Sequence, residues 1–357
     1  MSPLPSVGRR ALAVAATLVF AATVAAGCGN DDSDSKSGSK ADSGTKLVIY
    51  SGREKKLVDP LYKEFERSSG IDLEVRYAES PAMAAQLLEE GDKSPADVFY
   101  SQDAGAIGAV EELLAPLPDG IADEVDAQYR DNKGRWTGVT GRIRTLVYNT
   151  DELKEGDLPD SVLGVTDPKW KGKIGVAPTN ASFIAFVSAL RLDKGDDAAK
   201  DFLEGLVANE PKIYEKNGPI VDAVSKGEVQ IGLVNHYYLY ERLAEDPDAP
   251  VANHFFEAGD VGNLVNVSAM GILKTSEHKE AARKLIDFML HDGQRFIVEE
   301  APEREYPLVV TEEIESNERY TELPPLDQNE GPDVELSDLG AELETTVGFI
   351  RDSGLTS

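Results

Sequence analysis

The sequence contains very few of the side chains that carry thiol or imidazole chemistry. Among its 357 residues there is one cysteine, Cys28, and there are four histidines. A single thiol cannot form an internal disulfide or a thiolate metal site. The histidines, at 236, 254, 278 and 291, have no metal-ligand spacing with one another. We therefore expect them to be surface residues or hydrogen-bonded polar residues rather than metal ligands.

Common catalytic motifs are also missing. The chain has no GxSxG, no HExxH, and no glycine-rich phosphate loop with a following lysine. The sequence therefore predicts a protein that is not an enzyme.

Positive charge is scarce as well. The chain has 36 lysines and arginines against 65 aspartates and glutamates, a formal net charge of −29. Such an acidic protein is repelled by nucleic acid and by anionic lipid surfaces, so we expect neither as a partner. The hydrophobic content of 41% is nevertheless large enough for a substantial core.

Only one hydrophobic run is long, and it lies at the N-terminus. Arg9 and Arg10 precede the uncharged stretch "ALAVAATLVFAATVAA", which small residues follow. This pattern predicts an export signal over residues 1–27. The end of this stretch and the two residues after it, "AAGC" (25–28), resemble the lipobox of bacterial lipoproteins, in which the cysteine, here Cys28, is acylated and becomes the new N-terminus. A plain secretory signal with an incidental cysteine is the alternative.

The segment that follows, 28–45, is rich in Asp, Ser, Gly and Lys and has almost no large apolar residue. It cannot bury enough surface to order itself, so we expect a disordered tether. Loss of residues 1–27 removes two arginines and no acid, which takes the formal charge from −29 to −31. We expect an exported protein on the extracytoplasmic face of the cell membrane, attached only through a lipid anchor.

Beyond residue 45, strand and helix patterns alternate without an internal repeat. Short strand patterns lie at 46–51, 71–77 and 96–101, each followed by a helical pattern, the third of which covers 104–114. A long β-rich run covers 134–150, two helical stretches follow residue 181, and a last helix is expected at 336–351. Such alternation predicts an α/β protein with parallel sheets, whose ligands bind beyond the carboxyl ends of the strands.

One strand, in "VQIGLVNHYYLYERL", ends in an unusual pair of adjacent tyrosines, Tyr237 and Tyr238. Adjacent side chains on a strand point to opposite faces, and on a helix they diverge by about 100°. A core strand gains nothing from such a pair. At a strand end, two phenols could instead converge on a bound ligand.

With these pieces in order, the chain resembles the ferric-ion-binding proteins of bacterial ABC importers over about residues 46–310. The likeness is carried by "LVIYSGRE", "SPADVFYSQD", "WTGVTGRIRTLVYNT", "GKIGVAPTNASF", "YEKNGP", "GEVQIGLVNHYYLY" and "REYPLV". It implies the two-domain fold of type II periplasmic binding proteins, joined by two hinge strands and closing like a flytrap. The first lobe would be 46–142 plus 269–320, and the second 143–268 plus 321–357.

The resemblance implies that Tyr237 and Tyr238 bind Fe(III) through phenolate oxygens, and hard cations do take oxygen ligands. The family often has a histidine where this chain has Glu54, which could replace it or could merely be a solvated residue at a helix start. A carboxylate is common in the family where Gln102 stands. Asp103 could supply that carboxylate, or could only cap the helix that follows.

The resemblance also implies a synergistic carbonate or phosphate. The basic residues it points to are Arg142 and Arg144, which strand alternation places on one face, although an ion pair with a neighbouring acid is the alternative. Helix-start amides are expected at Asn180, Ala181 and Ser182. Asn217, Asn235 and Gln102 would add hydrogen bonds.

As function, the resemblance implies a monomeric solute-binding protein that delivers Fe(III) to the membrane subunits of an ABC permease. The same fold holding an organic anion, a ferric chelate or a polyamine is the first alternative, because Glu54 and Gln102 depart from the family pattern. An enzyme that uses the tyrosines and Arg142 in acid–base chemistry is the remote alternative.

Overall fold

The computed structural model describes residues 44–118, 120–301, 304–326 and 331–356. The predicted signal, Cys28 and nearly all of the predicted tether lie outside these residues. Within them, no helix is long and apolar enough to cross a membrane.

The strands and helices alternate along the first part of the chain, as the pattern predicts. The strands are β1 (Lys46–Ser51), β2 (Asp72–Tyr77), β3 (Val98–Ser101), β4 (Trp136–Asn149), β5 (Ile174–Val176), β6 (Lys212–Ile213), β7 (Ile231–Asn235), β8 (Val251–His254), β9 (Val265–Ile272) and β10 (Tyr306–Pro307). The helices are α1 (Lys55–Ser69), α2 (Ser80–Glu90), α3 (Ala104–Gly108), α4 (Ala181–Lys194), α5 (Asp196–Ala208), α6 (Asn217–Ser225), α7 (Tyr237–Glu245), α8 (Lys279–Leu290), α9 (Asp292–Glu299), α10 (Glu312–Glu315), α11 (Glu318–Thr321) and α12 (Leu339–Asp352).

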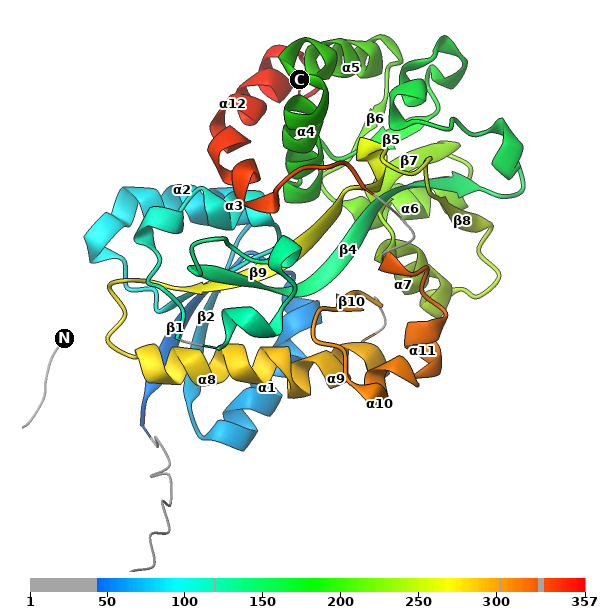
Figure 1. Cartoon of the computed structure of the whole chain (residues 1–357). Coiled ribbons are helices and arrows are strands. Elements are labelled where there is room, and N and C mark those ends of the chain that lie inside the picture. The colour runs from blue at the N-terminus through cyan, green and yellow to red at the C-terminus, as the bar shows by residue number, and fades with distance from the viewer. Residues whose placement is uncertain (1–43, 119, 302–303, 327–330, 357) are drawn as a thin grey trace, which may run out of the picture. The chain divides into compact units, whose positions relative to one another are not determined.

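The strands form one hydrogen-bonded series in the order β2-β1-β3-β9-β4-β7-β5-β6, with β8 and β10 also paired to β4. The outer pairs are parallel, whereas β9 and β4 run antiparallel to their neighbours. The long strand β4 changes partner along its length, pairing with β9 from Trp136 to Ile143 and with β7 from Arg144 to Tyr148. Figure 1 shows β4 and β9 running between a first group of strands, β1, β2 and β3, and a second group, β5, β6 and β7.

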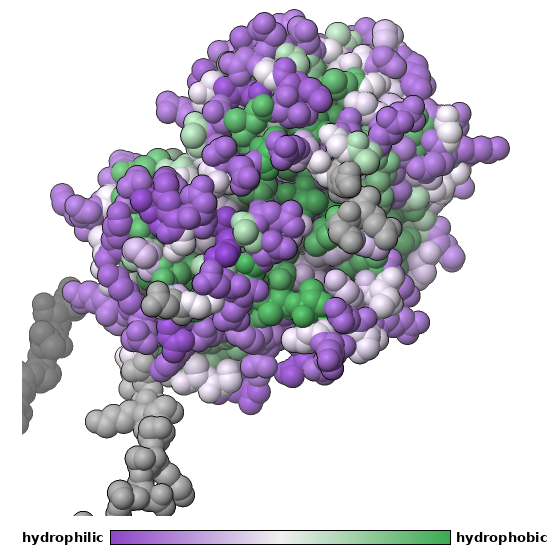
Figure 2. Space-filling view, viewed as in Figure 1, coloured by the Kyte–Doolittle hydropathy of each residue, from purple (hydrophilic) through white to green (hydrophobic). Residues whose placement is uncertain are grey.

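This connectivity is that of the two-domain α/β fold that the sequence predicts. The partner change on β4 lies beside the predicted lobe boundary after residue 142, although the boundaries themselves stay a prediction. Helices α1 and α8 pack with the first group of strands, and α4, α5 and α6 with the second. On the face drawn in Figure 2, hydrophilic residues cover most of the surface, in keeping with the acidic composition.

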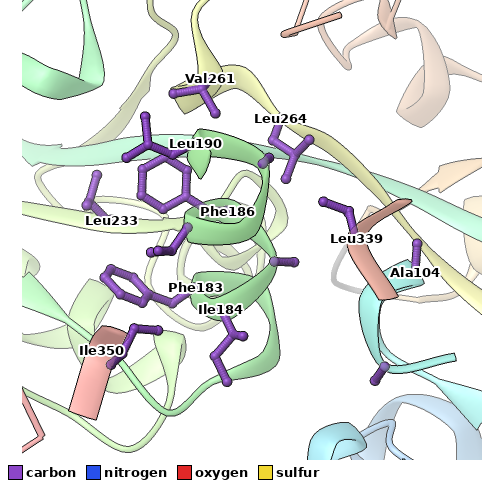
Figure 3. Close-up of a cluster of buried hydrophobic side chains, with 14 of the residues drawn as sticks. Ala104, Phe183, Ile184, Phe186, Leu190, Leu233, Val261, Leu264, Leu339 and Ile350 are labelled. Atoms are coloured by element: carbon purple, nitrogen blue, oxygen red, sulfur yellow. The ribbon is translucent and has the colours of Figure 1, made fainter. Parts of the chain in front are cut away.

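The C-terminal helix α12 packs on helices from both groups. Ser188 of α4 donates a hydrogen bond to Thr346 of α12 over 2.8 Å, and Leu339 lies beside the start of α3 at Ala104 (Figure 3). Where α12 crosses α3, a Cβ on Gly340 would lie 2.4 Å from the carbonyl carbon of Gly108. The two backbones therefore meet directly, and only glycine fits at that crossing.

One helix prediction is wrong in extent. The helical pattern over 104–114 forms only the short α3, and a 3-10 turn over Glu111–Leu113 follows it. Gly105 and Gly108 weaken the helix, and Leu114 leaves it to form a bridge with Leu273 next to β9.

Candidate functional site

The tyrosine pair lies where β7 ends and α7 begins. Strand β7 ends at Asn235 and helix α7 starts at Tyr237, so the phenols are the first two residues of a helix. Their rings do not diverge: the centroids are 4.3 Å apart at an interplanar angle of 31°. Both side chains are buried, with 1% and 6% of their surface exposed. The two rings therefore lie close together, and their convergence on a ligand stays a prediction.

Both phenols are held in the protonated form. Burial raises the pKa of Tyr237, and the Glu305 carboxylate raises it further, against the opposing effect of Arg53 and Arg142. Burial raises the pKa of Tyr238 well above its usual value, and its neighbour Tyr237 adds to this. A ligand that binds phenolates at neutral pH must therefore supply enough positive charge to displace both protons.

Arg142 is the most unusual charged residue near the tyrosines. It lies on β4 with 1% of its surface exposed, and its Nε, Nη1 and Nη2 atoms have no hydrogen-bond partner. Burial lowers the pKa of Arg142, while Glu305, Tyr237 and Asp103 act in the opposite direction. A buried guanidinium with three unpartnered nitrogens is costly to keep and is shaped to grip an oxyanion.

Arg144, two residues along β4, is held more firmly. Its Nη2 donates to the Leu233 carbonyl over 2.9 Å, and its Nη1 donates to Asn235 over 3.4 Å. Burial lowers the pKa of Arg144 to about 9, and the two tyrosines oppose this shift. No salt bridge to either arginine is seen among the described residues. The alternative of a structural ion pair therefore finds no support in that part of the chain.

The predicted helix start is present at Asn180. Helix α4 begins at Ala181, and the Asn180 side chain caps it by accepting from the Ser182 N–H over 3.1 Å. The same oxygen accepts from the Asn217 amide over 3.2 Å, while the Asn217 oxygen is buried without a partner. The start of α4 is thus ordered around a buried polar centre, which is formed by the side chains of Asn180, Ser182 and Asn217.

The hydroxyl of Ser182 gathers the remaining predicted polar residues. It accepts from the Asn235 amide over 2.9 Å and from the Gln102 amide over 3.4 Å. Gln102 comes from the β3–α3 junction, whereas Asn235 ends β7. The structure thus brings together side chains 133 residues apart, since Asn235 and Gln102 share one hydroxyl.

Asp103 is buried and caps α3, as one of the two alternatives predicts, while its role as a ligand stays a prediction. Its Oδ1 accepts from the Ala106 N–H over 2.9 Å, yet its Oδ2 is buried and has no partner. Burial raises the pKa of Asp103 to about 6, against the stabilising effects of the helix amides and Arg142. One carboxylate oxygen therefore remains free to act as a ligand.

Glu54 lies farther out than the other predicted residues. It precedes α1 without capping it, and its side chain is 25% exposed. Its carboxylate accepts from Lys216 over 3.3 Å and lies 3.9 Å from Lys56. Lys56 also pairs with Glu241 of α7. The structure therefore places Glu54 in a chain of ion pairs near Tyr238.

Sequence reasoning missed a buried ion pair beside the tyrosines. Arg53 donates from Nη2 to Oε2 of Glu305 over 2.5 Å, and Thr140 donates to the same oxygen over 2.8 Å. Arg53 lies in the block "LVIYSGRE" and Glu305 in the block "REYPLV", both of which carry the family resemblance. Charged residues inside those blocks were the available signal.

His236, immediately before the pair, fits the expectation of a satisfied polar residue. It is fully buried, accepts from the Ile143 N–H at Nδ1 and donates from Nε2 to the Arg304 carbonyl. Burial lowers the pKa of His236 to about 4, so the ring is neutral at physiological pH. Within the described ranges no three His, Cys, Asp or Glu side chains form a group that could hold a metal.

Comparison with known proteins defines the class of this protein. Residues 93–330 match a family model described as bacterial extracellular solute-binding protein. The chain belongs to this family, whose members bind solutes for transport rather than catalyse reactions, as the sequence predicts.

Among its relatives, the major ferric iron-binding protein of Neisseria meningitidis is 36% identical over 269 residues, which cover 73% of this chain and 80% of the relative. The Fe(3+)-binding periplasmic protein of Serratia marcescens is 31% identical over 85% of this chain and 90% of the relative. The crystal structure of iron-bound HitA from Pseudomonas aeruginosa superimposes with a TM-score of 0.79 at 32% identity, over 87% of this chain and 99% of that one.

Proposed function

We propose that this protein captures Fe(III) outside the cytoplasm, with Tyr237 and Tyr238 as phenolate ligands, and hands it to the membrane subunits of an ABC permease. The observation that carries the proposal is a buried, closely packed pair of phenols near the unpartnered guanidinium of Arg142. The names of the relatives, which state ferric iron binding, support it.

The proton inventory of the site fits a trivalent cation. Since burial keeps Tyr237 and Tyr238 protonated, each phenolate that binds iron releases one proton. The affinity for Fe(III) should then rise with pH, by about two logarithmic units per pH unit from this pair. Iron titrations in competition with citrate at several pH values test this. A slope unchanged in Tyr237→Phe would remove that residue from the ligand set.

A synergistic carbonate or phosphate completes the proposed site. Arg142 offers three nitrogen atoms without a partner, and Arg144 adds positive charge. The start of α4 at Asn180, Ala181 and Ser182 would supply backbone amides once the Ser182 N–H leaves the Asn180 side chain and the Asn180 N–H leaves the Ala177 carbonyl. Asn217, Asn235 and Gln102 border the same polar centre.

The carboxylate ligand is better supported at Asp103 than at Glu54. Asp103 has a buried oxygen without a partner, whereas Glu54 is shared between Lys216 and Lys56. Glu54 remains the alternative, since it would need only to exchange an ion pair for a metal bond.

We further propose that the two lobes close on iron by bending β4 and β9, and that acylated Cys28 anchors the monomeric protein. Detergent partitioning tests the anchor: wild type should enter the detergent phase and Cys28→Ser should not. Aqueous partitioning of both would contradict it.

A second candidate is an organic anion or a ferric chelate as the ligand. The burial of Arg53, Arg142 and Arg144 favours it, because three guanidinium groups suit a polycarboxylate. The same arginines argue against a polyamine. Native mass spectrometry of protein loaded with ferric citrate separates the two candidates: retained iron without citrate supports the first, and retained citrate the second.

A further inference from the structure

Among the residues that the structure describes, Glu305 is the one acidic residue that hydrogen-bonds to a buried arginine of this site. It stands just before β10, in which Tyr306 pairs with Gly141 of β4. Because the two strands are antiparallel, the next position of this register brings Glu305 beside Arg142. The preceding residue, Arg304, has a left-handed φ of 54°, which is unfavourable for a non-glycine residue. His236 holds that segment by donating to the Arg304 carbonyl over 3.1 Å.

The two oxygens of Glu305 are used differently. Oε2 accepts from Arg53 and Thr140, whereas Oε1 is buried and has no partner. Thr140 also shares a hydrogen bond of 2.6 Å with Ser268. The carboxylate is therefore fixed in position while half of its bonding capacity remains open.

The charge of Glu305 reaches the proposed ligands. Burial opposes its ionisation, but Arg53 and Arg142 outweigh that effect, so the pKa of Glu305 lies below its usual value and the group is ionised. The same carboxylate raises the pKa of Tyr237 and opposes the loss of the proton from Arg142. The charge of Glu305 thus acts on Tyr237, a proposed iron ligand, and on Arg142, a proposed anion ligand.

We infer that Glu305 is a positioning and charge-setting residue of the binding site: it holds Arg53 in place and leaves Arg142 free, and its negative charge strengthens cation binding while weakening anion binding. This inference rests on the proposed function. It assigns to Glu305 a role that neither the tyrosines nor the arginines can supply, because each of them carries no negative charge before iron binds.

Glu305→Gln is the test, since it removes the charge and nearly preserves the shape. We expect its affinity for Fe(III) to fall by about tenfold or more, because a unit charge is lost close to a trivalent cation. We expect the affinity of the iron-free variant for inorganic phosphate to rise. Iron affinity would be measured in competition with citrate, and phosphate affinity by calorimetry. Glu305→Asp, which keeps the charge, should stay closer to wild type in both.

Asp97→Asn provides a matched control. Asp97 is also buried and accepts from the Val48 N–H and the Ser276 hydroxyl, and within the described part of the chain no interaction links it to the tyrosines. It should leave both affinities unchanged.

A fall in iron affinity together with a rise in phosphate affinity distinguishes a charge effect from a general disruption of the site. A Glu305→Gln variant that loses affinity for iron and phosphate together, or changes neither, would overturn the inference. Failure of wild type to bind iron would instead overturn the proposed function.

Discussion

Replacement of Arg142 by methionine should make the iron-free protein more stable and less functional at once. The guanidinium is buried with three unpartnered nitrogens. An unpaired buried charge is costly to keep out of water, and replacing buried ion pairs by apolar side chains of similar volume often stabilises a protein by about 1–4 kcal/mol. We expect a gain in this range in buffer free of phosphate and carbonate, measured by urea unfolding.

Added phosphate should make wild type the more stable of the two proteins. A ligand present at 100 times its dissociation constant stabilises the folded state by about 2.7 kcal/mol. Wild type should show such a gain on adding phosphate, and Arg142→Met should show little or none. Buried Trp136, on the same strand, offers a fluorescence signal for both titrations.

Arg144→Met is the matched control two residues along the strand. Its guanidinium donates to the Leu233 carbonyl, so its loss should destabilise the protein by about 1–3 kcal/mol. The reasoning is refuted if Arg142→Met is destabilised like Arg144→Met in anion-free buffer, or gains as much stability from phosphate as wild type does.

Three further predictions concern the crossing of α12 and the carboxylates. Gly340→Ala places a Cβ 2.4 Å from the Gly108 backbone and should cost about 1–3 kcal/mol in unfolding free energy. Gly348→Ala, whose Cβ would have no neighbour nearer than 3.8 Å, should instead stabilise by about 0.4–1 kcal/mol, and the same sign for both would contradict the close contact. Asp103→Asn should lower iron affinity more than Glu54→Gln does, and the reverse order would make Glu54 the ligand. Because burial raises the pKa of Asp103 to about 6 from an unfolded value of about 3.9, this group stabilises the iron-free protein below that lower pH and loses the contribution as pH rises through 6. Asp103→Asn should flatten that part of the stability curve, as urea unfolding at a series of pH values would show.

Local patterns predicted the elements that frame the site. The β-rich run over 134–150 became β4, and the polar residue before the apolar stretch at 181 became the cap of α4. The tyrosine pair is predicted from its place at the end of a strand pattern together with the family resemblance, and its binding of a ligand stays a prediction. These features depend on residues close in sequence, which is where periodicity and capping rules apply.

Features that depend on distant pairing could not be found in the same way. Arg53 and Glu305 are 252 residues apart, and no local pattern indicates that one will neutralise the other. The early end of α3 likewise reflects the distant bridge that Leu114 forms with Leu273 next to β9. The ion pair of Glu54 with Lys216 was also invisible, because it forms only when α1 and the segment before α6 are brought together.

The visible absorption of the iron-loaded protein tests the central claim most directly. Purified protein would be titrated with ferric citrate and its spectrum recorded, with iron content measured in parallel. If Tyr237 and Tyr238 bind Fe(III) as phenolates, the loaded protein should show a phenolate-to-iron charge-transfer band that makes it orange to purple. Each single Phe variant should lose part of the band, and the double variant all of it. A full band in the double variant, or bound iron without a band in wild type, would contradict the account.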